Sequence, residues 1–167
     1  MHILVCGGAG YIGSHMVRLL LERGHEVTVL DNLSTGYRDA VTGGRFEFGD
    51  LGDPQIVDRV LQSSTFDAVM HFAAFIRVEE SVAQPGKYFH NNFSNTLNLL
   101  DSMVRHGVRK FIFSSTAAVY GEPQYVPVDE KHPREPINPY GSSKKFVEDA
   151  LFYYSSAHGL KSVPLRY

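Results

Sequence analysis

The stretch Ile3-Leu4-Val5-Cys6-Gly7-Gly8-Ala9-Gly10-Tyr11-Ile12-Gly13 decides the fold of this chain. Its first four residues form a short apolar run, which is typical of a buried strand. Apolar residues recur at helical spacing directly after the glycines, at Ile12, Met16, Leu19 and Leu20. A strand that passes through a glycine-rich turn into an amphipathic helix is the usual first unit of a parallel, doubly wound sheet.

The rest of the chain repeats this alternation of strand and helix. We predict six strands, over Ile3–Cys6, Glu26–Leu30, Phe46–Phe48, Asp67–Phe72, Lys110–Ser115 and Ser162–Arg166. Asp53-Pro54 carries the signals of a helix start, and Gly24 and Gly107 those of helix ends. Five prolines between Gly121 and Pro139 predict a long loop. The fold class is α/β, a Rossmann-type sheet with helices on both faces, formed by residues 1–167 as one domain.

Composition excludes several classes of protein. The 167 residues carry 16 Lys and Arg against 18 Asp and Glu, for a net charge of −2, and no basic run indicates nucleic-acid binding. No apolar stretch is long enough for a membrane span or a signal peptide. The single cysteine, Cys6, cannot form an internal disulfide, and eight scattered histidines show no metal-site spacing. We therefore expect a soluble, cytoplasmic protein without a bound metal.

The glycines match a dinucleotide-binding fingerprint, as Gly7-x-x-Gly10-x-x-Gly13 with Gly8 as an alternative first position. Such a turn lets the backbone approach a pyrophosphate, which then lies at the N-terminus of the following helix. Asp31 ends the second predicted strand about 20 residues later, where a carboxylate binds an adenosine ribose. This carboxylate favours NAD over NADP, although Arg38 lies nearby. Asp50-Leu51 is placed to reach the adenine, or Asp50 caps a turn.

A second group of residues predicts acid–base chemistry. Tyr140 and Lys144 stand at positions i and i+4 of a predicted helix, so their side chains share one face. Thr116 follows the fifth strand, at the same edge of the sheet. A tyrosine titrates near pH 10, and a nearby ammonium group would favour its phenolate. Together with the glycine turn, this trio indicates hydride chemistry with a nicotinamide cofactor.

These motifs resemble the N-terminal half of an extended short-chain dehydrogenase/reductase, and within that family the UDP-glucose 4-epimerases, which interconvert UDP-galactose and UDP-glucose. The similarity runs through nearly the whole chain. The matching segments are residues 7–15, 31–36, 49–51, 71–74, 80–81, 91–92, 113–121 and 138–141.

The resemblance implies a set of NAD-binding residues besides the glycines. They are Tyr11, Ile12, Asp31, Asn32, Leu33, Ser34, Thr35, Gly36, Asp50, Leu51, Phe72, Ala73, Ala74, Asn92, Ser114 and Tyr167. It further implies that Tyr140 takes the proton of the sugar 4-hydroxyl and that Thr116 bridges the sugar oxygen and the phenol. Lys144 would bind the nicotinamide ribose and tune Tyr140. By the same resemblance, tightly bound NAD accepts the C4 hydride and returns it to the other face of the sugar.

Related sugar-nucleotide 4,6-dehydratases resemble this chain but usually place Asp-Glu directly after the threonine of the fifth strand. Here those positions are Ala117-Ala118, whose methyl groups cannot act as acid or base. Two further functions stay open, namely an NAD-binding module without turnover and a 4-epimerase of another UDP-sugar.

Three positions depart from the epimerase pattern. Ile76 stands where a lysine is often found near the cofactor, Asn95 replaces a usual glycine, and Thr116 replaces the usual serine. The length departs as well, because family members are about twice as long and carry a C-terminal domain that holds most of the UDP-sugar. By the same resemblance we expect a homodimer that pairs the helices around residues 87–105 and 140–157.

Overall fold

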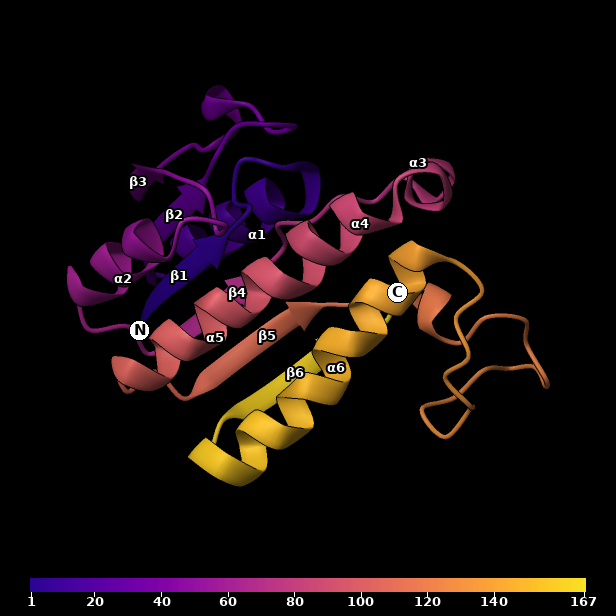
Figure 1. Cartoon of the computed structure of the whole chain (residues 1–167). Helices are drawn as coiled ribbons and strands as arrows, with labels where there is room; N and C mark the ends of the chain where they lie inside the picture. Colours follow the sequence, from indigo (N-terminus) through magenta and orange to yellow (C-terminus); the bar gives the residue numbers. More distant parts are fainter.

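The computed structural model describes all 167 residues, and its centre is one six-stranded sheet (Figure 1). The strands are β1 (His2–Cys6), β2 (Glu26–Asp31), β3 (Arg45–Phe48), β4 (Ala68–His71), β5 (Lys110–Ser114) and β6 (Lys161–Leu165). All neighbouring strands are parallel, in the order β3-β2-β1-β4-β5-β6. Every predicted strand agrees with the observed one to within one residue at each end, so the predicted fold class is confirmed.

The helices connect these strands. They are α1 (Tyr11–Glu22), α2 (Pro54–Gln62), α3 (Val78–Ala83), α4 (Pro85–Tyr88), α5 (Asn95–Arg105) and α6 (Pro139–His158), with 3-10 turns at Arg38–Ala40 and Ala117–Val119. The predicted start of α2 and the predicted ends of α1 and α5 are confirmed. The Asp53 side chain accepts hydrogen bonds from the backbone N–H groups of Gln55 and Ile56 at the start of α2, and Gly24 and Gly107 have positive φ after α1 and α5.

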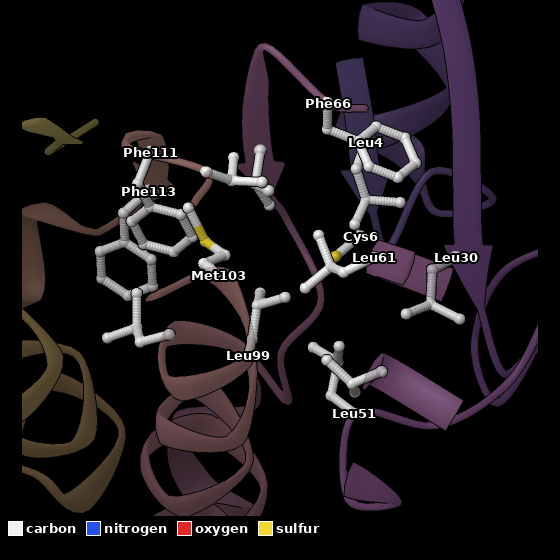
Figure 2. Close-up of a cluster of buried hydrophobic side chains, with 14 of the residues drawn as sticks. Leu4, Cys6, Leu30, Leu51, Leu61, Phe66, Leu99, Met103, Phe111 and Phe113 are labelled. Carbon is white, nitrogen blue, oxygen red and sulfur yellow. The ribbon is translucent and has the colours of Figure 1, made fainter. Parts of the chain in front are cut away.

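Alternate residues of β1 enter two separate hydrophobic clusters, because successive side chains of a strand point to opposite faces. Ile3 and Val5 pack with Val17 and Leu20 of α1. Leu4 and Cys6 belong to the larger cluster on the other face, to which α2, α5 and α6 contribute (Figure 2). Helices therefore cover both faces of the sheet. None of the helices combines the length and the hydrophobicity that a membrane span needs.

The strand order places the candidate site. β2 and β4 flank β1, so the chain turns to one side of β1 after the first helix and to the other side after the third strand. Ligands of such sheets bind at this reversal, beyond the carboxyl ends of the strands. The loops that follow β1, β2 and β4 meet there.

One helix differs from the prediction. We expected a continuous helix from about Lys87 to Arg105, whereas residues Phe89–Ser94 between α4 and α5 are wound as a π-helix. A π-turn holds one more residue than an α-turn, and such turns often occur at functional sites. Asn92, in this segment, has its side chain bonded to the loop after β4.

Candidate functional site

The glycine-rich turn packs so closely that two of its glycines admit no side chain. Gly7 has φ +79°, and a Cβ atom there would lie 2.5 Å from the backbone nitrogen of Ala73. A Cβ on Gly13 would lie 2.1 Å from the carbonyl oxygen of Gly7. Gly10 differs, because its Cβ would meet only that same oxygen, at 3.4 Å. Gly7 and Gly13 are therefore needed for the turn itself, whereas the room at Gly10 is available to a ligand.

A cavity lies over this turn, and most of its lining residues are those predicted to bind a dinucleotide. Predicted residues in the lining are Gly7, Gly10, Asp31, Asn32, Ser34, Thr35, Asp50, Leu51, Phe72, Ala73 and Ala74. Leu30, Gly49, Phe75 and Asn91 also line it and were not predicted. The loops after β1, β2, β3 and β4 thus converge on one cavity at the topological switch point, as a dinucleotide site of this fold requires.

Asp31 lines this cavity, and two backbone hydrogen bonds hold its carboxylate in place. One carboxylate oxygen accepts a hydrogen bond from the backbone N–H of Ala9 at 2.9 Å, and the other accepts one from Leu33 N–H at 2.8 Å. Each oxygen keeps a lone pair, so the carboxylate can still accept from a ribose hydroxyl. Leu33 has φ +56°, which turns the chain so that Ser34 and Thr35 reach the cavity. Arg38, the residue that favoured NADP, stacks on the ring of Phe46.

Asp50 serves a turn and the cavity together. Its carboxylate accepts from the backbone N–H of Gly52 at 2.6 Å and from the side-chain amide of Asn32 at 2.5 Å. The prediction left open whether Asp50 reaches an adenine or holds a turn. Its hydrogen bonds are those of a turn carboxylate, and its place in the lining leaves it facing a ligand as well.

Several other predicted residues lie outside this lining. Tyr11 and Ile12 are exposed at the start of α1, and Gly36 packs against the backbone of Ala9. Asn92 is buried, and its amide is bound to the N–H and the carbonyl of Phe75, both at 2.9 Å, and to the Ser143 hydroxyl at 3.2 Å. These hydrogen bonds give Asn92 a positioning role, and its predicted contact with the cofactor stays a prediction. It ties the cavity loop to α6.

The remaining predicted residues, which include the catalytic ones, gather at the carboxyl ends of β5 and β6. The Asn138 side chain caps α6 by accepting from Gly141 N–H at 2.8 Å, and this cap places Tyr140 in the first turn of the helix. The Thr116 hydroxyl accepts from Ala118 N–H at 3.1 Å. Ser114 Oγ and the Tyr167 hydroxyl lie 2.6 Å apart.

Tyr140 has a raised pKa in this structure. Burial raises it, the nearby Thr116 hydroxyl opposes the rise, and the Tyr167 phenol adds to it. Tyr140 and Thr116 are thus close enough to influence one another, and the predicted bridge to a sugar oxygen stays a prediction. Lys144 is not among the groups that shift this pKa, and its predicted tuning of Tyr140 stays a prediction.

Lys144 lies in a buried environment next to the end of β5. Its ammonium is buried beside the ring of Phe113 and donates a hydrogen bond to the backbone carbonyl of Ser114 at 2.9 Å. Burial lowers its pKa to about 7. Near neutral pH this amine is therefore present in both the charged and the neutral form, so a modest change of surroundings can move a proton to or from Nζ.

The sequence analysis missed Glu148, which holds this end of the site together. Its buried carboxylate on α6 accepts hydrogen bonds from Ser115, Arg134 and Arg166. These residues come from the end of β5, the proline-rich loop and the end of β6. Ser115 precedes Thr116 and Arg166 precedes Tyr167, so one carboxylate positions two predicted site residues. No sequence motif marks it beyond its position two helical turns after Tyr140.

Residues 3–167 match the NAD dependent epimerase/dehydratase family. The chain belongs to this family. Its NAD dependence agrees with the cofactor that the glycine turn and Asp31 predict. The resemblance to UDP-glucose 4-epimerases stated from the sequence motifs is confirmed by the relatives that follow.

Among curated epimerases of the family, the UDP-glucose 4-epimerase of Lacticaseibacillus casei is 49% identical over 168 residues. That match covers 100% of this chain and 51% of the relative. A putative UDP-arabinose 4-epimerase of Arabidopsis thaliana is 48% identical over 176 residues, covering 99% of this chain and 40% of the relative. The chain thus spans about half the length of the curated relatives it matches.

The fold agrees with solved epimerase structures equally well. The crystal structure of UDP-glucose 4-epimerase from Brucella ovis in complex with NAD superposes with a TM-score of 0.98 at 44% identity. The superposition covers 99% of this chain and 51% of that one. The six-stranded sheet described here is therefore shared with an NAD-binding epimerase.

Proposed function

We propose that this chain is the NAD-binding half of a UDP-hexose 4-epimerase that interconverts UDP-galactose and UDP-glucose. The observation that carries the proposal is the convergence of two groups of residues at one edge of the sheet. The dinucleotide cavity over the glycine turn lies beyond β1, β2 and β4. Tyr140, Thr116 and Lys144 lie beyond β5 and at the start of α6, with Asn92 linking the two groups through Phe75 and Ser143.

The cavity residues fit NAD. A Cβ atom on Gly10 would have only one close neighbour, so the backbone at the α1 N-terminus is open to a pyrophosphate. Asp31 would accept hydrogen bonds from the adenosine ribose, and Ser34 and Thr35 supply hydroxyl groups above it. When bound, NAD supplies the hydride acceptor and donor for C4 of the sugar.

The proton in this proposal is moved by Tyr140. Its phenolic oxygen removes the proton of the sugar 4-hydroxyl, and the nearby Thr116 hydroxyl orients the phenol. Phenolate formation must overcome the raised pKa of Tyr140. Lys144 contributes by holding the Ser114 backbone and, when protonated, by placing a buried positive charge one helical turn from Tyr140.

Conversion of UDP-galactose to UDP-glucose by the 167-residue chain with added NAD tests this proposal. We expect turnover that Tyr140→Phe abolishes and that Tyr125→Phe, an exposed tyrosine of the proline-rich loop, leaves unchanged. Turnover that survives Tyr140→Phe would contradict the role of Tyr140.

Two alternatives are kept because specific observations favour them. The dinucleotide cavity is lined by residues between Gly7 and Asn91 and needs none of the catalytic residues, which fits an NAD-binding module without turnover of its own. NAD binding without conversion of any UDP-sugar would support that alternative. The relatives include both UDP-glucose and UDP-arabinose 4-epimerases. Conversion of UDP-arabinose but not of UDP-galactose would support a different substrate.

We also propose that the protein forms a homodimer through α6 and the preceding helical segment. Phe152 and Tyr153 are each 69% exposed on α6, and Phe146 on the same helix stacks with Phe89 and contacts Phe93. Exposed aromatic side chains on neighbouring helices are typical of an interface. Sedimentation should show a dimer for this chain and a monomer for Phe152→Glu.

A further inference from the structure

A second cavity adjoins the first. The two share Ser34, Thr35, Ala74 and Phe75, and the second is further lined by Ile76, Arg77, Glu80, Lys87 and Tyr88. Its walls come from the loop after β2, the loop after β4 and the short helices α3 and α4. Since β1 lies between these two strands, the shared region spans the glycine turn that follows β1.

The first cavity offers no charged cation to the pyrophosphate of a dinucleotide. The lining of the first cavity contains two carboxylates, Asp31 and Asp50, and no lysine or arginine. A pyrophosphate carries two negative charges, and helix and backbone N–H groups supply only partial positive charge. Within the linings of the two cavities, the only lysine and arginine are Lys87 and Arg77 of the second, so a full positive charge for the pyrophosphate would come from one of these.

Lys87 already forms an ion pair within the protein. Its ammonium lies 2.5 Å from a carboxylate oxygen of Glu80 and sits over the ring of Phe75. Arg77 forms no ion pair, and its side chain is exposed. Arg77 is thus the one cation in the walls of either cavity that is free to pair with a ligand.

Hydrogen bonds with two buried side chains fix the backbone around Arg77. The backbone N–H of Arg77 donates to the Tyr88 hydroxyl at 3.0 Å, and Tyr88 OH in turn donates to Glu80 at 2.8 Å. Phe75 lies two residues before Arg77, and its backbone N–H and carbonyl are both hydrogen-bonded to the Asn92 side chain. Tyr88 and Asn92 are buried, so buried side chains hold the backbone that carries the exposed Arg77 side chain in the wall of the second cavity.

We infer that Arg77 is a cofactor-binding residue, whose guanidinium pairs with the pyrophosphate of the bound dinucleotide. The inference rests on the proposed function. A guanidinium suits this role because it can donate two parallel hydrogen bonds to phosphate oxygens. Its place across the cavity from Ser34 and Thr35 would close the pyrophosphate between the two loops.

Equilibrium titration of the chain with NAD tests this inference, with adenosine as a phosphate-free probe. We expect Arg77→Gln to weaken NAD binding by roughly 10- to 100-fold, the range for losing a charge-assisted hydrogen bond. Arg77→Lys should recover part of the loss. Adenosine binding should not change, and the weakening of NAD binding by added salt should be smaller in Arg77→Gln.

Arg109→Gln is the matched control, because Arg109 lies just before β5, at the opposite edge of the sheet. It should bind NAD like the unmodified chain. If the unmodified chain binds NAD and Arg77→Gln binds it equally well, the assignment of Arg77 is wrong while the proposed function stands. An equal loss for NAD and adenosine would also overturn it. Absence of NAD binding by the unmodified chain would overturn the proposed function, and this inference with it.

Discussion

Replacing Lys144 with methionine should make the protein more stable at neutral pH. The ammonium is buried, and a single carbonyl, that of Ser114, accepts a hydrogen bond from it. Burial lowers the pKa from 10.5 to about 7. At about 1.4 kcal/mol per pH unit, this difference corresponds to roughly 5 kcal/mol as an upper bound. Relaxation and water penetration reduce such penalties, so we expect a gain of about 2–3 kcal/mol in the free energy of unfolding.

The gain should depend on pH with a defined sign. Between pH 7 and pH 10.5 the unfolded lysine keeps its proton, whereas the folded one has lost it. The unfolded state then binds more protons, so the stability of the unmodified chain rises with pH in this window. Below pH 7 both states are protonated and the full penalty applies. The advantage of Lys144→Met should therefore be largest at pH 7 and below and shrink by about 1–2 kcal/mol by roughly pH 9.

Urea unfolding of the unmodified chain and of Lys144→Met, each at pH 7 and at roughly pH 9, measures how the stability difference between the two proteins changes with pH. Groups that titrate alike in both proteins cancel in this comparison. Lys145→Met is the matched control, since Lys145 is partly exposed and paired with Asp149 at 3.2 Å. Its effect should stay within about 0.5 kcal/mol at either pH. A pH-independent difference for Lys144→Met, or a loss of stability at pH 7, would refute the reasoning.

Three further substitutions test the site's framework by urea unfolding. Gly13→Ala should unfold the glycine turn and cost at least about 3 kcal/mol, because its Cβ would lie 2.1 Å from Gly7 O; a well-folded variant would contradict this. Asn92→Ala should cost about 2–4 kcal/mol, since it leaves both backbone groups of Phe75 unpaired, and a cost below 1 kcal/mol would mean that water replaces the amide. Glu148→Gln should cost about 1–3 kcal/mol by leaving Arg134 and Arg166 without their shared carboxylate, and the cost should be nearly lost when Arg166 is also replaced by methionine.

The strands and the nucleotide cavity could be predicted because local signals determine them. The apolar run before Gly7 and the helical spacing after Gly13 fix the first βαβ unit, and its turn admits only glycine at both positions. Parallel strands all end at one edge, so the order of the motifs along the chain already places Asp31, Asp50 and Ala73 together. Eleven of the predicted residues line the cavity for this reason.

Long-range polar contacts could not be predicted in the same way. Asn92 and Glu148 reach partners 14 to 51 residues away, and nothing in their own neighbourhood in sequence indicates these partners. The surroundings of Lys144 were likewise out of reach. Its spacing from Tyr140 predicts a shared helix face, but the depth of burial, which sets its pKa, depends on β5 and on Phe113.

The most direct test of the nucleotide site is calorimetric titration with NAD of the unmodified chain and of Gly10→Ala. Gly10 has φ −78° and ψ 176°, which alanine adopts freely, and the added methyl group has room within the protein itself. Gly86→Ala, whose Cβ would meet nothing within 4 Å, is the control. We expect saturable binding to the unmodified chain and to Gly86→Ala, and binding at least about tenfold weaker to a fully folded Gly10→Ala. Equal NAD affinity in all three proteins, or no binding to any of them, would contradict the placement of NAD over the glycine turn.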